Sequence, residues 1–201
     1  MRRASRPILH LVRHGAHDDL GVRLTGRSDD VTLNAEGRRQ ARILGERLAD
    51  GRVVRIETSP RLRCRDTAWI IGQAVGLDPI TEPALDEIDF GVWTRASFRA
   101  LAPLPAWHAW NDRRGSTRPP QGESMAEAQA RILGHVYALS RRALGDVILV
   151  SHQDIIKAVL MHRDRLDLDR HMDLEVAPAS VHSVVIDAGL MAPAPQGELV
   201  P

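Results

Sequence analysis

After a short basic segment, the chain reads Ile8-Leu9-His10-Leu11-Val12-Arg13-His14-Gly15, an apolar run that ends in a cation, an imidazole and a glycine. The run predicts a strand from Ile8 to Arg13 that presents Arg13 and His14 at its C-terminal end. An imidazole nitrogen can attack phosphorus while an adjacent guanidinium holds the phosphoryl oxygens. Gly15 would remove a side chain where an anionic group approaches the backbone. This stretch therefore predicts a site that handles phosphate groups.

A second stretch repeats the pattern near the other end of the chain, at Val147-Ile148-Leu149-Val150-Ser151-His152. It is apolar on both faces, which is typical of a central parallel strand. In open α/β sheets the reactive groups collect beyond the carboxyl ends of the strands. We therefore expect His14 and His152 to lie on the same rim of one sheet.

Strand-like and helix-like segments alternate along the chain, which favours a mostly parallel sheet with helices on both faces, a three-layer α/β/α sandwich. Asn34 is typical of the N-cap of a helix that continues to about Ala49, and Ser124-Met125-Ala126-Glu127 matches a capping box. The other expected elements are a strand at 53–57, a helix that Ser59-Pro60 starts and Gly76 ends, a short helix at 98–101, a buried helix at 155–161 and a last strand at 181–186.

Length and composition bound the class of protein. The 201 residues fit one domain with its core at about 8–187, and we expect 191–201 to form a loose tail. The net charge of +1 argues against nucleic acid as a partner, and no apolar run is long enough to span a membrane. The single cysteine, Cys64, cannot form an internal disulfide, which fits a cytoplasmic protein. We interpret Cys64 as a small helix residue rather than an activated thiol.

Residues 102–122 break the alternating pattern, because they hold four prolines and two tryptophans. The composition excludes a simple core element, and two interpretations stay open: a lid over the sheet edge, or an ordinary variable surface loop. Arg113 and Arg114 in this segment could grip a second acidic group of a substrate, although a solvated charge pair is the favoured expectation.

Two further segments carry groups suited to phosphate chemistry. Arg63 falls in the first turn of the helix after the second strand, on the rim where the two histidines are expected and where a helix N-terminus favours anions. The stretch Leu85-Asp86-Glu87-Ile88-Asp89-Phe90-Gly91 is rich in carboxylates and could supply a general acid. The residues alone leave its three carboxylates as alternatives for that acid.

Four pieces of the chain, in order, resemble the motifs of the histidine phosphatase superfamily, the group that contains phosphoglycerate mutases and acid phosphatases. They are Arg13-His14-Gly15, Thr58-Ser59-Pro60-Arg61-Leu62-Arg63-Cys64-Arg65-Asp66-Thr67-Ala68, Leu85-Asp86-Glu87-Ile88-Asp89-Phe90-Gly91-Val92-Trp93 and Val150-Ser151-His152. The resemblance covers roughly residues 8–187 and implies a phosphoglycerate mutase-like fold. It also implies that Arg63, rather than Arg61 or Arg65, binds phosphate and that Glu87 is the acid.

The resemblance implies a mechanism in which His14 becomes phosphorylated and Glu87 protonates the leaving group. Arg13, Arg63 and a protonated His152 would hold the phosphoryl oxygens, so that no metal and no other cofactor is required.

The resemblance also implies further contacts with the substrate, which would come from Gly15, Thr25, Gly26 and Gln153. The chain departs from the family pattern at Ala16-His17-Asp18, at Gln153 and at Arg95. These departures concern the outer phosphate contacts, and nothing in the sequence assigns a role to His17.

The predicted function is hydrolysis of a small-molecule phosphomonoester. The first alternative is a phosphoglycerate mutase-type phosphotransferase, which must keep water away from the phosphohistidine and needs more covering structure than one modest excursion. A non-catalytic regulatory module on the same fold is a third hypothesis, disfavoured because none of the central groups is lost. The sequence leaves the oligomeric state open, with a homodimer as one option.

Overall fold

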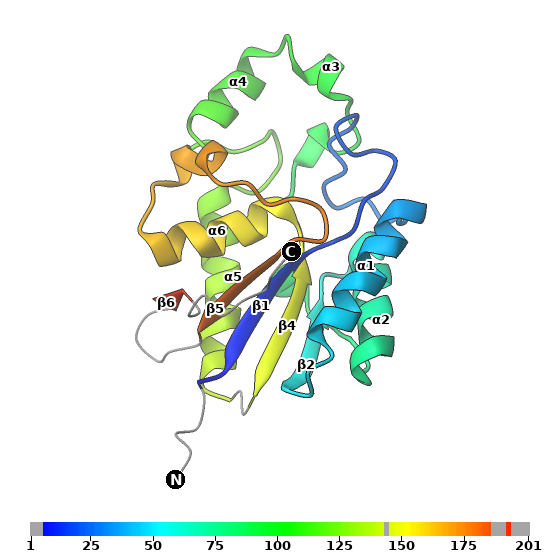
Figure 1. Cartoon of the computed structure of the whole chain (residues 1–201). Coiled ribbons are helices and arrows are strands. Elements are labelled where there is room, and N and C mark those ends of the chain that lie inside the picture. The colour runs from blue at the N-terminus through cyan, green and yellow to red at the C-terminus, as the bar shows by residue number, and fades with distance from the viewer. Residues whose placement is uncertain (1–5, 143–144, 186–191, 194–201) are drawn as a thin grey trace.

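The computed structural model describes residues 6–142, 145–185 and 192–193. A six-stranded sheet runs through its centre in the order β3-β2-β4-β1-β5-β6 (Figure 1). The strands are β1 (Ile8–Arg13), β2 (Val53–Thr58), β3 (Ile80–Thr81), β4 (Asp146–Ser151), β5 (Val181–Val185) and β6 (Ala192–Pro193). The strands β1 to β4 pair in parallel, whereas β5 pairs antiparallel with β1 and β6 antiparallel with β5. The prediction of a mostly parallel sheet is therefore confirmed.

Helices cover both faces of the sheet, which confirms the three-layer sandwich (Figure 1). One face carries α1 (Ala35–Leu48) and α2 (Leu62–Val75), and the other carries α5 (Met125–Ser140) and α6 (Gln153–Asp164). Alternate residues of the central strands belong to different cores, since Val12 and Val150 pack with α1 and α2 whereas Leu11 and Leu149 pack with α5 and α6. Burial on both faces explains why β1 and β4 are apolar almost throughout.

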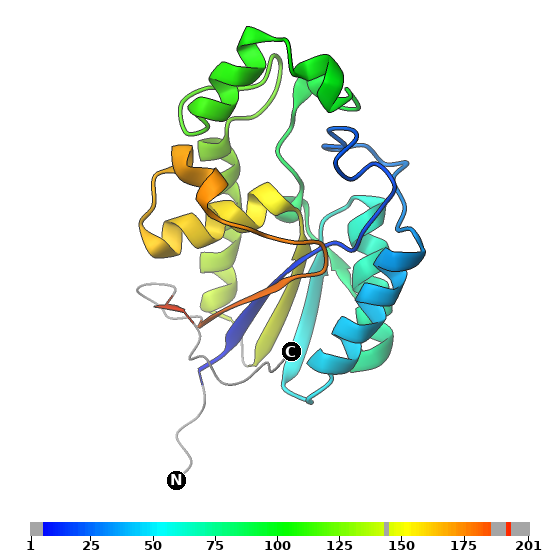
Figure 2. The same cartoon turned by 45° about the horizontal axis from the view of Figure 1, so that its top comes forward.

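The pairing of β1 with β4 brings the two histidine-bearing strand ends together. Arg13 lies in register with Ser151, and the backbone N–H of His14 donates to the Ser151 carbonyl at 3.0 Å. Because the two strands are parallel, His14 and His152 both follow at the carboxyl edge of the sheet. In Figure 2 this edge is surrounded by the loop after β1, by the N-terminus of α6 and by the two short green helices at 98–101 and 105–112.

Two expected helix caps are confirmed, and one expected helix start is wrong. Asn34 caps α1 by accepting from the Gly37 N–H, and Ser124 and Glu127 form the capping box of α5. α2 begins at Leu62 instead of Pro60. The reason is that the Ser59 N–H still donates to the Val150 carbonyl at 2.9 Å, so sheet pairing continues one residue beyond β2 and delays the helix.

The segment before α5 crosses over the carboxyl edge of the sheet and is more ordered than the sequence indicates. It contains η1 (Pro83–Leu85), η2 (Gly91–Trp93), α3 (Phe98–Leu101) and α4 (Pro105–Asp112). Within 102–122, Trp110 is only 1% exposed and packs edge to face with Phe90 and Trp93. As expected, the segment is not a simple core element, but its helix α4 is anchored to the core because Trp107 and Trp110 share one face of that helix.

After α6 the chain forms a short 3₁₀ segment and then the last strands of the sheet. A short 3₁₀ segment, η3 (Leu168–Asp173), follows α6, and β5 matches the expected last strand up to Val185. Ile186 and all of the expected tail except Ala192–Pro193 lie outside the described residues. Within the described ranges, no helix combines the length and the hydropathy that a membrane crossing demands.

Candidate active site

One cavity of about 280 Å³ collects most of the predicted site residues at the carboxyl edge of the sheet. The predicted residues that line it are Arg13, His14, Thr25, Gly26, Arg63, Glu87 and Gln153. His152 lies behind this lining, fully buried, with its ring centroid 5.4 Å from that of His14. Four separate segments thus meet at one place. They are the end of β1, the end of β4, the first turn of α2 and the stretch between η1 and η2.

His14 is held as a neutral imidazole with one nitrogen available. Its Nδ1 lies 2.9 Å from the Gly15 carbonyl oxygen, which can only accept, so Nδ1 carries the proton and Nε2 keeps its lone pair. Burial, followed by the positive charge of Arg63, lowers the pKa of His14 well below its usual value of 6.5. A neutral imidazole with a free Nε2 is the form that can act as a nucleophile.

His152 is also neutral, which differs from the expectation of a protonated residue. Burial and then Arg63 lower its pKa well below 6.5. Arg63 Nη2 donates to His152 Nδ1 at 2.9 Å, so the proton of the ring sits on Nε2, which donates to Ser59 Oγ at 2.7 Å. Both ring nitrogens are therefore engaged, and His152 orients Arg63 instead of adding a third positive charge.

Two guanidinium groups supply the positive charge of the site. Arg63 is only 1% exposed, and its Nη2 also donates to the Gly26 carbonyl at 2.6 Å. Arg13 Nη1 donates to the Val176 carbonyl at 2.6 Å. The Nε atoms of both arginines are buried without a hydrogen-bond acceptor among the described residues. Buried donors of this kind nearly always have a partner, so the pair is suited to an anionic ligand.

The structure favours Glu87 as the acid among the three carboxylates of its segment. Burial, and then the nearby charge of Asp154, raise the pKa of Glu87 to about 8, so its carboxyl group is mostly protonated at neutral pH. Asp86 instead pairs with Arg61 Nε at 3.0 Å. Asp89 accepts from the Gly91 N–H at 2.9 Å and does not line the cavity.

Gly15 has a different role from the expected one. It does not line the cavity, and its N–H donates to Thr67 Oγ1 at 3.1 Å. A Cβ atom at this position would lie 2.6 Å from the carbonyl oxygen of Gly37 in α1. The residue is therefore a glycine because β1 and the first turn of α1 approach each other closely here.

The remaining predicted contacts reach the cavity from two directions. Thr25 and Gly26 belong to the loop after β1, and Gly26 adopts a positive φ of 49° that a side chain would strain. A Cβ there would also lie 2.9 Å from the ring of Phe90. Gln153 is the first residue of α6 and follows His152 directly.

Two residues that sequence reasoning left without a role also line the cavity. His17 is only 4% exposed, and its ring centroid lies 5.2 Å from that of His14. Burial, followed by the charge of Arg63, lowers the pKa of His17 to about 4, so this imidazole is neutral too. Asp154 lies in the first turn of α6 and also lines the cavity. Its position two residues after His152 is the signal in the sequence that could have identified it as a residue of the site.

Arg114 is not part of a solvated charge pair, so that expectation is wrong. Its side chain is buried, donates to Asp154 Oδ2 at 2.8 Å and stacks 3.4 Å from the centre of the Trp110 ring. The sequence could not reveal this pair because its two members lie 40 positions apart.

Cys64 is a buried residue of α2, as expected, and burial raises its pKa to about 12. Its thiol is therefore unreactive at neutral pH. Over the described part of the chain, no group of three or more histidine, cysteine, aspartate or glutamate side chains could hold a metal ion.

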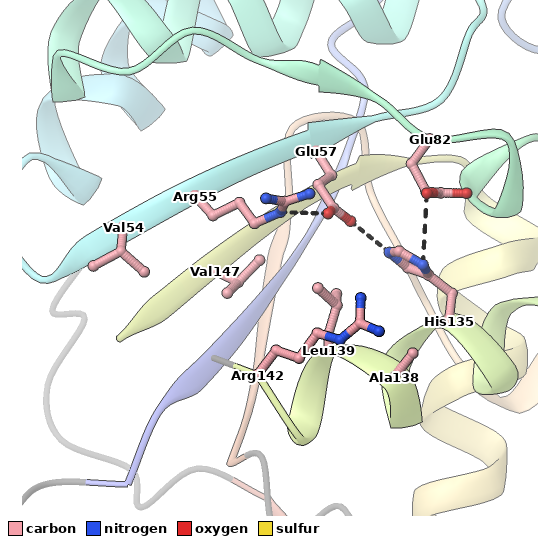
Figure 3. A pocket seen from close by; sticks show the side chains of 9 residues that line it. All are labelled: Val54, Arg55, Glu57, Glu82, His135, Ala138, Leu139, Arg142 and Val147. Carbon is pink, nitrogen blue, oxygen red and sulfur yellow. Dashed lines mark hydrogen bonds and ion pairs between the residues drawn. The ribbon is translucent and has the colours of Figure 1, made fainter. Parts of the chain in front are cut away.

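A larger cavity, of about 570 Å³, lies between β2, β4 and α5 and shares no lining residue with the one at His14. Figure 3 shows that four of its ionisable groups pair with one another, namely those of Arg55, Glu57, His135 and Glu82. The Glu57 carboxylate accepts from Arg55 and from His135, each at 2.5 Å, and His135 Nδ1 lies 3.7 Å from Glu82. This cavity contains none of the predicted catalytic residues.

Known proteins resemble this chain in sequence and in fold. A curated protein of Serratia proteamaculans (strain 568), named "Probable phosphoglycerate mutase GpmB", is 35% identical over 129 residues, which are 62% of this chain and 59% of that protein. The match thus spans about three fifths of the length of that relative.

Solved structures match over more of the chain. The structure of YhfR from Bacillus stearothermophilus has a TM-score of 0.84 and 27% identity, covering 96% of this chain and 98% of that chain. A mycobacterial glucosyl-3-phosphoglycerate phosphatase has a TM-score of 0.82 and 26% identity, covering 92% of this chain and 95% of that chain. The family model of the histidine phosphatase superfamily (branch 1) matches residues 9–192. That match covers most of the chain and includes every residue that lines the cavity at His14. The chain therefore belongs to the histidine phosphatase superfamily.

Proposed function

We propose that this chain is a phosphomonoester hydrolase that forms a covalent phosphohistidine on His14. The observation that carries the proposal is that His14, with a free Nε2, lines one cavity together with Arg13, Arg63 and Glu87. The proton states of His14 and Glu87 support it. His14 is neutral with a free Nε2, and Glu87 is protonated at neutral pH. A nucleophile and an acid with separated pKa values are what cleavage of a phosphate ester requires.

In the first step, His14 Nε2 attacks phosphorus, and the bond from phosphorus to the ester oxygen breaks. Glu87 transfers its proton to that oxygen, so the product leaves as a neutral alcohol. The guanidinium groups of Arg13 and Arg63, which line the cavity, stabilise the charge on the phosphoryl oxygens.

In the second step, the Glu87 carboxylate takes a proton from water while that water attacks the phosphohistidine. The phosphorus–nitrogen bond breaks, its electron pair returns to Nε2, and inorganic phosphate leaves. Glu87 is again protonated, so the residues return to their starting states without a metal or other cofactor.

The cavity favours a small-molecule substrate over a phosphoprotein or nucleic acid. Its volume is about 280 Å³, and Leu20, Leu24, Phe90 and Phe98 contribute apolar lining. Thr25, Gly26 and Gln153 would contact the part of the substrate next to the phosphate. A cytoplasmic location fits the single, buried thiol of the chain.

The test is release of phosphate from p-nitrophenyl phosphate by the purified chain and by a His14→Asn variant. We expect the variant to lose all measurable activity, whereas His162→Asn, at an exposed pair with Tyr137, keeps it. Quenching during turnover should trap a phosphoryl-enzyme that survives alkali but not acid, since it contains a phosphorus–nitrogen bond. Absence of activity in the unmodified chain would instead support a non-catalytic module.

A second candidate, a phosphoglycerate mutase-type phosphotransferase, is favoured by the names of the curated relatives. The two activities separate when 3-phosphoglycerate is supplied with bisphosphoglycerate as primer. Isomerisation faster than release of inorganic phosphate would overturn the hydrolase proposal in favour of the mutase.

A further inference from the structure

A buried ion pair connects the 102–122 segment to the first turn of α6. Arg114 Nη1 donates to Asp154 Oδ2 at 2.8 Å, and both side chains are buried, at 6% and 7% exposure. Arg114 is fixed from two further sides, since it stacks on Trp110 and its Nη2 donates to Asn111 Oδ1 at 3.1 Å. The carboxylate of Asp154 is therefore held in one position by a segment that is distant in sequence.

Asp154 shares the cavity with Glu87, so two buried carboxyl groups face the same space. Other charges surround them: Arg13 from β1 and Arg63 from α2 lie near Glu87, while Arg114, Lys157 and His171 lie near Asp154. Two neighbouring carboxyl groups in a buried site do not both ionise readily, and they behave as a pair that shares a proton.

We propose that Asp154, fixed by Arg114, is a positioning residue for the acid step, whose carboxylate keeps the shared proton on Glu87 next to the leaving group. This inference rests on the proposed hydrolase function. It explains why a segment without catalytic residues of its own buries an arginine beside the cavity.

The surrounding charges decide which carboxyl group holds the proton. Arg13 and Arg63 both lower the pKa of Glu87, yet burial and then the Asp154 charge outweigh them and raise it to about 8. Burial opposes ionisation of Asp154 too, but Arg114 and Lys157 overcome it and lower the pKa of Asp154. The cation from 102–122 thus places the negative charge on Asp154 and the proton on Glu87.

Comparing hydrolysis of two substrates distinguishes a role of Asp154 in the acid step from a merely structural role. An alkyl phosphate releases a strongly basic alkoxide that needs the Glu87 proton, whereas p-nitrophenolate leaves as a stable anion and needs it much less. Loss of the acid form should therefore slow hydrolysis of a primary alkyl phosphate and spare p-nitrophenyl phosphate.

The experiment measures kcat against pH for both substrates in Asp154→Asn and Arg114→Gln. Asp154→Asn keeps the volume but removes the charge, so the basic limb of the alkyl phosphate profile should move down by about 1 pH unit. Arg114→Gln removes the cation that keeps Asp154 ionised, so Asp154 should compete with Glu87 for the proton, and kcat for the alkyl phosphate should fall while kcat for p-nitrophenyl phosphate is kept. The control is Arg118→Gln, which breaks an exposed pair with Glu127 in the same segment and should leave the limb unchanged.

Each outcome decides the proposal. A lower limb in Asp154→Asn together with a selective loss of alkyl phosphate hydrolysis in Arg114→Gln supports it, and an unchanged profile in either folded variant overturns it. If Asp154→Asn fails to fold, the selectivity of the loss in Arg114→Gln decides alone. If the unmodified chain hydrolyses neither substrate, the proposed function fails; if it hydrolyses both without these changes in the variants, only the role of Asp154 fails.

Discussion

The imidazole of His152 meets that of His14 edge to face, with 5.4 Å between the ring centroids and an angle of 63° between the planes. Its Nδ1 accepts from Arg63 and its Nε2 donates to Ser59, so neither nitrogen is left for a ligand. The Ser59 hydroxyl in turn lies 3.4 Å from Asp86 Oδ1. This chain of hydrogen bonds fixes Arg63 beside His14.

Ser59→Ala should slow catalysis through this chain without removing a charged group. His152 would lose the acceptor of its Nε2–H, a hydrogen bond of about 1 kcal/mol, which corresponds to a roughly fivefold decrease in kcat. Ser140→Ala, at the exposed C-terminal end of α5, is the matched control. Steady-state kinetics with p-nitrophenyl phosphate checks the prediction, and an unchanged kcat in Ser59→Ala would show that the hydroxyl does not orient His152.

The pH dependence of the unmodified chain should follow from Glu87 and His14. Glu87 must be protonated to act as the acid, so kcat for an alkyl phosphate should fall as the pH rises through about 8. His14 must be neutral, and because its pKa is lowered, kcat/KM should not fall as the pH drops through 6.5. In Glu87→Gln the basic limb should disappear and kcat should fall roughly 10²- to 10⁴-fold. A basic limb that persists in Glu87→Gln would assign it to another group.

The sequence predicted the parts of the site that depend on strand ends. Two apolar runs predicted β1 and β4 as strands of one parallel sheet, and their pairing in the structure sets His14 beside His152. Arg63 followed in the same way from its place in the first turn of α2. Such positions can be predicted because a parallel sheet aligns the carboxyl ends of its strands.

The contributions of loops and of distant segments could not be predicted in this way. His17 lies in the loop after β1, where no periodicity fixes the direction of a side chain, yet it packs beside His14. Trp110 and Arg114 belong to a proline-rich stretch without a clear periodicity, and only the folded structure shows that both are buried. The proton states of His152 and Glu87 depend on burial, which no local sequence pattern records.

Gly15→Ala should destabilise the fold more than it affects ligand binding. The new Cβ would lie 2.6 Å from the Gly37 carbonyl oxygen, a backbone atom that can move only with α1. Overpacking of this kind costs about 1–3 kcal/mol, which should appear as a lower denaturant midpoint in urea unfolding. Gly134→Ala in α5, where a Cβ meets nothing within 4 Å, is the control and should not destabilise the chain. A Gly15→Ala variant of unchanged stability and raised KM would instead support the expected role in phosphate binding.

Glu57→Gln should destabilise the chain in a pH-dependent manner, through the network shown in Figure 3. Glu57 is only 1% exposed, and although burial opposes its ionisation, hydrogen bonds from His135 and Arg55 lower its pKa below 4.5. A carboxylate whose pKa is lower in the folded state stabilises that state above the pKa of the unfolded chain, and the stabilisation is lost as the pH falls through the folded value. The variant should therefore lose about 1–3 kcal/mol of unfolding free energy at pH 7.

That difference between Glu57→Gln and the unmodified chain should shrink as the pH falls below about 4.5, where Glu57 itself becomes protonated. Urea unfolding at several pH values measures it. Glu36→Gln is the control, because Glu36 pairs with Arg39 on the exposed surface of α1 and solvent screens that pair. An equal loss of stability at neutral and acidic pH would mean that Glu57 acts through packing alone, and not through its charge against His135 and Arg55.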